Sequence, residues 1–217
     1  MLSFLVELVN TMSEQEIDTL TKINTKAYAE DNPWEVMIGG DWSLSEDLAR
    51  AMIRATLLEG QVYVVKTQNG KIVSFGLWFK PQTAIFSTAE QRKLGFDEFF
   101  AKLKPEVKYW YTHTYPEIAQ KYAEPLFTDE EKKKRWWCYN LATDPEYQGL
   151  GCATTLVDHV YQVAVKAEGF IGLATALELN LKKYLSMAFH ERGSFLMPSP
   201  ISDTTNHVLT RESQGPE

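Results

Sequence analysis

The segment 141–155, LATDPEYQGLGCATT, constrains the fold of this chain more than any other. Residues 136–143 are typical of a β-strand, Asp144-Pro145 ends that strand, and two closely spaced glycines precede a stretch with the apolar period of a helix. Because Gly149 and Gly151 lack a Cβ atom, their backbone can turn N–H groups inward toward one anion, and the free N–H groups of the next helix point at the same place. The segment therefore predicts a strand, a pyrophosphate-binding loop and a helix, in that order.

Two other phosphate-binding loops use glycines in this way, and the sequence fits neither. A P-loop requires Gly-Lys-Ser/Thr, which does not occur here. A dinucleotide-binding fingerprint requires Gly or Ala where Thr154 stands, and an acidic residue at the end of a second strand about 20 residues later. A plain glycine turn between a strand and a helix remains as the alternative without a ligand.

The hexapeptide 148–153, Gln-Gly-Leu-Gly-Cys-Ala, matches the pattern Arg/Gln-x-x-Gly-x-Gly/Ala. It resembles the acetyl-CoA loop of the GNAT superfamily of N-acetyltransferases, fungal-type members among them. The resemblance implies an α/β GNAT fold, with a mixed, mostly antiparallel sheet of about six to seven strands, splayed central strands and flanking helices. It also implies that the strand before the loop pairs with the pantetheine arm of acetyl-CoA, the cosubstrate, while loop N–H groups bind the pyrophosphate. The residues implied are Leu141, Ala142 and Thr143 for the arm, and Gln148, Gly149, Leu150, Gly151, Cys152, Ala153 and Thr154 for the pyrophosphate.

A second match lies at 184–189, Tyr-Leu-Ser-Met-Ala-Phe, which resembles the Tyr-x-x-x-Gly-Phe of many GNAT enzymes with Ala188 in place of Gly. The resemblance implies that Tyr184 lies near the CoA sulfur and acts as the general acid. This role is chemically sensible, because a donor with a pKa of about 10 can protonate a thiolate whose thiol has a pKa of about 8.5 as the C–S bond breaks. The alternative is a tyrosine that only packs on the helix face.

The sequence does not assign a general base. Related sequences often carry Asn where Leu177 stands and Glu where Ala174 stands, and strand 136–141 contains no carboxylate. Glu178 and His113 are candidates, although a solvated glutamate and a structural histidine are the simpler interpretations. The expected reaction is acetyl transfer to an amine by direct attack on the thioester. A catalytically inactive CoA-binding protein of the same fold, or a nucleotide-binding oxidoreductase, remains as an alternative.

Length and composition favour a single domain over residues 1–217, and the resemblance implies that it is an N-acetyltransferase domain. No apolar run reaches the roughly 18 residues of a membrane-spanning helix, and segment 2–9 contains Glu7 and is too short for a signal peptide. We therefore expect a cytoplasmic protein, with the nucleus possible, and no membrane partner. The net charge of −7 argues against nucleic-acid binding and suits a cationic partner, here a small-molecule or peptide amine. The oligomeric state is left open.

Cysteine and histidine show no pattern of metal ligation. The two cysteines, Cys138 and Cys152, lack ligand spacing, and the four histidines are scattered along the chain. We expect free thiols in a reducing compartment and no metal.

Local patterns predict the remaining elements. Ser13 and Glu16 have the spacing of a capping box, and Asn69-Gly70 is a strong signal for a hairpin turn. Before the glycine loop we expect a strand at 3–9, a helix from 14 that Asn32-Pro33 ends, a helix at 45–58 and a hairpin at 61–79. After it we expect a helix from 152 to about 167, a strand at 170–176, a helix at 180–191, and strands at 195–197 and 207–210.

Segment 81–135 is longer than a usual connection and contains several prolines. We expect an irregular insertion, helical around 88–103, that forms a lid or a wall for the substrate. Its densest aromatic part is 109–115, YWYTHTY. Such runs are more often packing residues than ligand contacts, but if any segment sets substrate preference we expect this one, with Trp110, Tyr111 and His113 as candidates.

Overall fold

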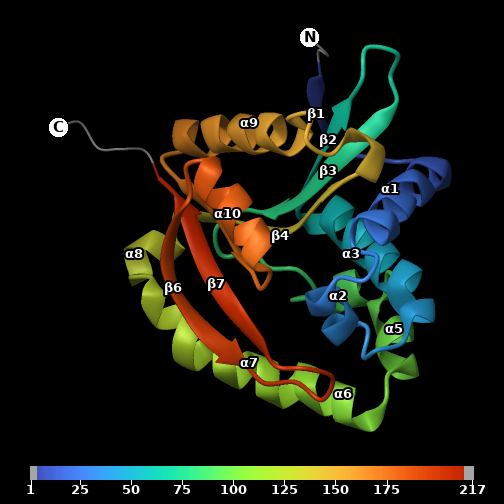
Figure 1. The fold of residues 1–217 in the computed structure, drawn as a ribbon, viewed down its shortest axis with the longest axis vertical. Helices are drawn as coiled ribbons and strands as arrows, with labels where there is room; N and C mark the ends of the chain where they lie inside the picture. Colours follow the sequence, from blue (N-terminus) through green and yellow to red (C-terminus); the bar gives the residue numbers. More distant parts are fainter. Residues whose placement is uncertain (1–3, 213–217) are drawn as a thin grey trace.

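A seven-stranded sheet forms the centre of the computed structural model, which describes residues 4–212. The strand order is β1-β2-β3-β4-β5-β7-β6, and every pair of neighbours is antiparallel except β4 and β5. The strands are β1 Leu5–Val9, β2 Gln61–Lys66, β3 Ile72–Phe79, β4 Arg135–Thr143, β5 Phe170–Thr175, β6 His190–Met197 and β7 Thr204–Arg211. Helices cover both faces (Figure 1). The predicted α/β class with a mixed, mostly antiparallel sheet is confirmed.

One face of the sheet packs against α1 (Glu14–Ala27) and α3 (Ser45–Glu59). The capping box at the start of α1 is present: the Ser13 N–H donates to Glu16 Oε2 at 2.8 Å, and the Glu16 N–H donates to Ser13 Oγ at 3.3 Å. The β2–β3 hairpin has its predicted antiparallel pairing.

The prediction that Asn32-Pro33 ends the first helix is wrong. Helix α1 ends earlier, at Ala27, and Asn32 and Pro33 form the first turn of a short helix, α2 (Asn32–Met37). Proline fits this place because its fixed φ suits a helix and the first turn needs no N–H donor. Asp31 therefore becomes the residue that caps α2.

The other face of the sheet packs against α9 (Cys152–Lys166), and α10 (Glu178–Ser186) follows β5. The helix predicted at 180–191 is too long, because Ala188 has a left-handed φ of 63° and the Phe189 N–H donates back to the Tyr184 carbonyl at 3.1 Å. This is the hydrogen-bond pattern of a helix end, where glycine is usual. It explains the glycine of the Tyr-x-x-x-Gly-Phe pattern and starts β6 at His190.

The insertion is mostly helical and not irregular as predicted. It contains α4 Ala89–Arg92, α5 Phe96–Lys102, α6 Pro105–Tyr109, the π-helical turn η2 Trp110–Thr114, α7 Tyr115–Ile118, the π-helical turn η3 Ala119–Ala123, the 3-10 turn η4 Glu124–Leu126 and α8 Asp129–Lys132. Pro105 stands in the first turn of α6, after the extended Lys104, where a missing N–H costs little. Pro116 and Pro125 lie further along the helical run, each two residues after a π-helical turn. Pro105 thus begins the helical run, and Pro116 and Pro125 do not interrupt it.

Residues 105–126 form one helical rod along the side of the molecule that carries β6 and β7 (Figure 1). The rod is fixed at two points. Trp110 Nε1 donates to the Pro198 carbonyl at 2.8 Å, and Tyr111 Oη donates to the Met37 carbonyl at 2.7 Å. The rod therefore connects α2 to the β6–β7 hairpin and closes one side of the space between them.

Candidate active site

Strands β4 and β5 separate halfway along β4. Cys138 pairs with Trp78 and Asn140 pairs with Leu77, which leaves Tyr139 as the extra residue of a β-bulge. The parallel ladder with β5 starts at Arg135 and ends at Cys138, next to this bulge. The predicted splay of the central strands is therefore present, and it leaves one edge of β4 open from the bulge to Thr143.

The open edge of β4 presents backbone polar groups. The Asp144 N–H donates to the Val73 carbonyl at 2.9 Å, so the alternation of an antiparallel ladder turns the N–H and C=O groups of Leu141 and Thr143 away from β3. Tyr28 Oη donates to the Leu141 carbonyl at 3.1 Å, and Gln148 Nε2 donates to the Thr143 carbonyl at 3.3 Å. Ala142 faces the other way, and Ser74 Oγ donates to its carbonyl at 2.8 Å.

The glycine loop follows the short turn η5 (Pro145–Tyr147) and leads directly into α9. Gly149 and Gly151 have φ angles of 75° and 86°, and a Cβ placed on either would meet no atom within 4 Å. The first turn of α9 has no side-chain cap and no acidic residue, so the N–H groups of Cys152, Ala153 and Thr154 remain available. An open loop before an uncapped helix N-terminus fits a pyrophosphate group.

A cavity of about 550 Å³ lies beside the splayed strands, within the size range of ligand pockets. Seven parts of the chain line it: the α1–α2 segment, α3, the insertion, β4, the end of β5, α10 and the β6–β7 hairpin. Asn180 and Tyr184 are one turn apart on α10, so both reach the cavity. The lining residues nearest the strand separation are Tyr28, Cys138, Tyr139, Asn140, Ala174 and Thr175.

Tyr184 is half-buried in this cavity, with its ring 5.6 Å from that of Phe189. Burial raises the pKa of Tyr184 well above its ordinary value, and negative charge on Tyr28, Cys138 and Asp31 would raise it further. The phenol therefore stays protonated at neutral pH and can only donate its proton.

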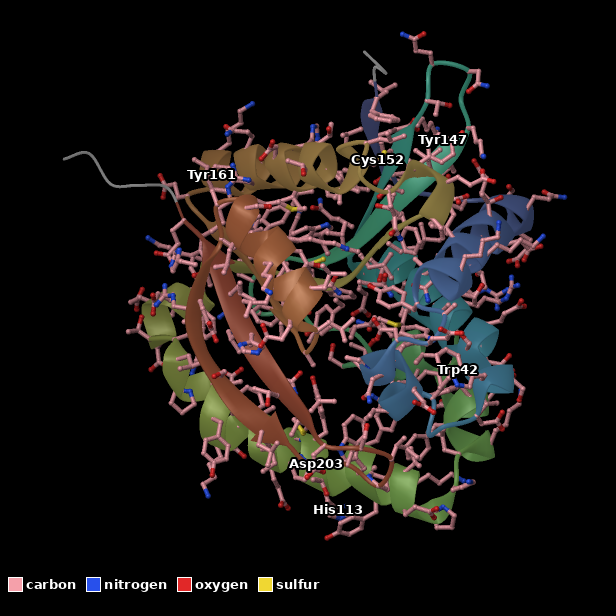
Figure 2. All side chains as sticks on the ribbon, viewed as in Figure 1. Trp42, His113, Tyr147, Cys152, Tyr161 and Asp203 are labelled. Carbon is pink, nitrogen blue, oxygen red and sulfur yellow. The ribbon has the colours of Figure 1, made fainter. Side chains whose placement is uncertain are left out.

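The three aromatic candidates of the insertion lie in different environments. Trp110 and Tyr111 line the cavity, but Trp110 is only 4% exposed and both side chains donate the hydrogen bonds that fix the rod. His113 lies on the outer side of the rod, with its ring centroid 4.3 Å from that of Tyr109, on which it stacks (Figure 2).

Glu178, which with His113 was a candidate general base, is exposed, and its Oε1 lies 3.8 Å from His207 Nε2. The structure brings neither His113 nor Glu178 to the cavity wall.

Sequence analysis missed Asp31, a cavity carboxylate that comes from the segment after α1. Its Oδ1 accepts the Trp34 N–H at 2.9 Å, and burial raises the pKa of its carboxyl group. The available signal was an aspartate directly before Asn32-Pro33, which is an N-cap pattern. Nothing in the sequence places that cap beside Tyr184, because the two belong to elements about 150 residues apart.

Asn140 is a second missed residue. It is buried at the cavity wall, its Nδ2 donates to Asn24 Oδ1 at 2.8 Å, and its own Oδ1 has no hydrogen-bond partner among the described residues.

Over residues 4–212 we find no cluster of three His, Cys, Asp or Glu side chains suited to a metal ion. In the same range, no helix is long and apolar enough to cross a membrane.

Comparison with known proteins is consistent with this geometry. The splayed sheet and its flanking helices define the fold of the acyl-CoA N-acyltransferases. The family model described as "Acetyltransferase (GNAT) family" matches residues 25–193, and the chain belongs to that family. It is therefore an acyltransferase by family.

Solved structures share the fold over nearly the whole chain at low sequence identity. One is described as "histone acetyltransferase HPA2 and related acetyltransferase" from Corynebacterium glutamicum, with 16% identity, a TM-score of 0.59, and 97% of this chain and 98% of that chain covered. Another is arylalkylamine N-acetyltransferase 2 from Aedes aegypti, with 12% identity, a TM-score of 0.60 and coverage of 95% and 98%. The C-terminal condensation domain of Ebony, in complex with beta-alanyl-dopamine, has 13% identity, a TM-score of 0.65 and coverage of 98% and 100%. A comparison with curated proteins gives no match.

Proposed function

We propose that this protein transfers an acetyl group from acetyl-CoA to an amine by direct attack of the amine on the thioester. The observation that carries the proposal is the position of Tyr184, a protonated phenol on the wall of the cavity beside the point where β4 leaves β5. The family membership of the chain supports the acyl transfer. The open edge and the glycine loop support the choice of acyl donor.

The residues of the loop and of β4 divide the binding of acetyl-CoA between them. N–H groups from Gly149 to Thr154 would bind the pyrophosphate, and Leu141 and Thr143 would pair with the pantetheine arm. The bound thioester supplies an activated acyl group. A backbone N–H on the open edge of β4 would donate to the thioester oxygen as that oxygen gains negative charge.

Tyr184 would protonate the sulfur as the C–N bond forms and the C–S bond breaks. The proton that the attacking nitrogen loses would go to water, and the Tyr184 phenolate would regain a proton from water. The raised pKa of this phenol does not oppose the role, because the same burial also destabilises a thiolate and raises the pKa of the departing thiol. Removing the hydroxyl without changing the ring should therefore slow the chemical step and leave binding intact.

The test is an assay of CoA release with a panel of amines, combined with calorimetry of acetyl-CoA binding. We expect Tyr184→Phe to lower kcat by roughly 10²- to 10⁴-fold while the dissociation constant of acetyl-CoA stays within twofold. Tyr161→Phe is the matched control, because Tyr161 lies on α9 and donates to the Glu212 carbonyl at 3.2 Å, outside the set of cavity-lining residues (Figure 2). Its kcat should stay within twofold of wild type.

Two results would overturn the proposal. If kcat of Tyr184→Phe stays within twofold of wild type, Tyr184 is a packing residue. If acetyl-CoA binds but no amine releases CoA, the protein is a CoA-binding member of the family without turnover, an alternative that the alanine at position 174 also fits.

A further inference from the structure

Residues 4–212 contribute one charged group to the cavity beside Tyr184. Among its lining residues in the described part of the chain, Asp31 alone has a charged side chain, and the others are apolar, aromatic or neutral polar. A substrate carboxylate or phosphate would lose its water there without gaining a cation. A second ammonium group on the substrate would likewise find no second acid.

Asp31 has one oxygen that the protein does not occupy. Its Oδ1 accepts the Trp34 N–H and caps α2, whereas no hydrogen bond to Oδ2 is present among residues 4–212. Burial raises the pKa of this carboxyl group, so its ionised form is under-solvated, and a bound cation would stabilise it. Asp31 accepts the Trp34 N–H, the Trp34 ring stacks on Tyr28, and Tyr28 Oη donates to the Leu141 carbonyl, so Asp31 lies on the side of the cavity that borders the open edge of β4.

The rest of the wall suits a flat or apolar body. Tyr28 and Trp34 stack with ring centroids 5.2 Å apart, and Phe86 stacks on Phe96 at 4.1 Å; all four residues line the cavity. Aromatic faces attract both apolar groups and the ammonium of an amine. A volume of about 550 Å³ leaves room for a ring and a short alkyl chain.

We propose that Asp31 binds the ammonium group of the acceptor, and that the site selects primary monoamines on an apolar or aromatic body over amino acids and polyamines. The proposal rests on the acetyl transfer proposed above, in which the bound ammonium first gives up one proton to water and then attacks the thioester as the neutral amine. It adds a specificity-determining residue and a substrate class to that reaction.

The substitution that tests the proposal is Asp31→Asn. Asparagine caps helices about as well as aspartate, so the bond to the Trp34 N–H is retained while the charge is removed. The matched control is Asp41→Asn. Asp41 caps the next turn, η1 (Trp42–Leu44), through a 3.0 Å bond from the Ser43 N–H, but it is exposed and does not line the cavity.

The kinetic experiment compares phenethylamine, phenylalanine and spermidine as acceptors. For wild type we expect kcat/KM with phenethylamine to exceed the values with the other two by on the order of a hundredfold, because they bring an unpaired carboxylate or extra cations into the cavity. For Asp31→Asn we expect the Michaelis constant for phenethylamine to rise about tenfold or more. The Michaelis constant for acetyl-CoA should stay within twofold in every variant, and Asp41→Asn should match wild type.

A binding experiment separates this inference from the proposed reaction. Calorimetry should show that wild type binds phenethylamine at least tenfold more tightly than the uncharged phenethyl alcohol, and that Asp31→Asn loses this difference. That result supports the inference even if no amine is acetylated, an outcome that would overturn only the acetyl transfer. A preference for phenylalanine or spermidine, or an unchanged Michaelis constant for phenethylamine in Asp31→Asn, would overturn the inference while acetyl transfer stands.

Discussion

Gly151→Val tests whether the glycine loop binds acetyl-CoA. Gly151 has φ of 86°, a left-handed conformation that a β-branched residue disfavours, and a Cβ at this position meets no atom within 4 Å. The substitution should therefore cost about 1–2 kcal/mol of unfolding free energy through backbone strain alone. It should also place a branched side chain where the pyrophosphate approaches the N-terminus of α9.

The rise in Tm on adding acetyl-CoA distinguishes backbone strain from the loss of pyrophosphate binding. Acetyl-CoA at 100 times its dissociation constant should add about 2.7 kcal/mol to the stability of wild type. For a chain of this length that free energy corresponds to a rise of about 5–10 °C in Tm. The Tm of Gly151→Val should start lower than that of wild type and should not rise when acetyl-CoA is added.

Gly70→Val is the matched control. Gly70 lies in the β2–β3 turn with φ of 83°, and a Cβ there also meets nothing within 4 Å. It should therefore lose similar stability but keep the full rise in Tm with acetyl-CoA. An equal rise in Tm for Gly151→Val and Gly70→Val, or no rise for wild type at millimolar acetyl-CoA, would refute acetyl-CoA binding at the glycine loop.

Three further predictions concern the cavity. Trp110→Ala or Tyr111→Ala should raise the Michaelis constant for the amine about tenfold and leave that for acetyl-CoA nearly unchanged; unfolding of both variants would show instead that these rings only pack. Burial raises the pKa of Asp31 in the folded protein above its value in the unfolded chain, so the folded protein loses stability as pH rises from the unfolded-state pKa to the folded-state pKa. Thermal melting should therefore show that Asp31→Asn is more stable than wild type at pH 7 but not at pH 3. Asn24→Ala should lower the free energy of unfolding, measured in urea, by about 1–3 kcal/mol, because it leaves the buried Asn140 Nδ2 without a hydrogen-bond acceptor. A decrease of less than about 0.5 kcal/mol would contradict this prediction.

Local sequence patterns correctly predicted those elements whose conformation depends on residues close together in the chain. The capping box of α1 and the Asn-Gly reversal depend on neighbouring residues and lie where they were predicted. The pair of glycines before α9 both have positive φ, as the predicted loop requires. The same patterns failed where proline or alanine has two possible roles. Pro33 begins the helix α2, although it was expected to end the preceding helix, and Ala188 ends a helix that was expected to continue.

The sequence by itself determined the strand, the glycine loop and the helix that follows it, because each depends on conformational preferences within a few residues. Only the tertiary structure decided which side chains share the cavity. β4 leaves β5 next to the bulge at Tyr139, and the rod at 105–126 closes the space between α2 and the β6–β7 hairpin. Asp31 and Tyr184 line the same cavity because the start of α2 and α10 both border it. Such a meeting depends on contacts between segments far apart in the chain, which no local pattern encodes.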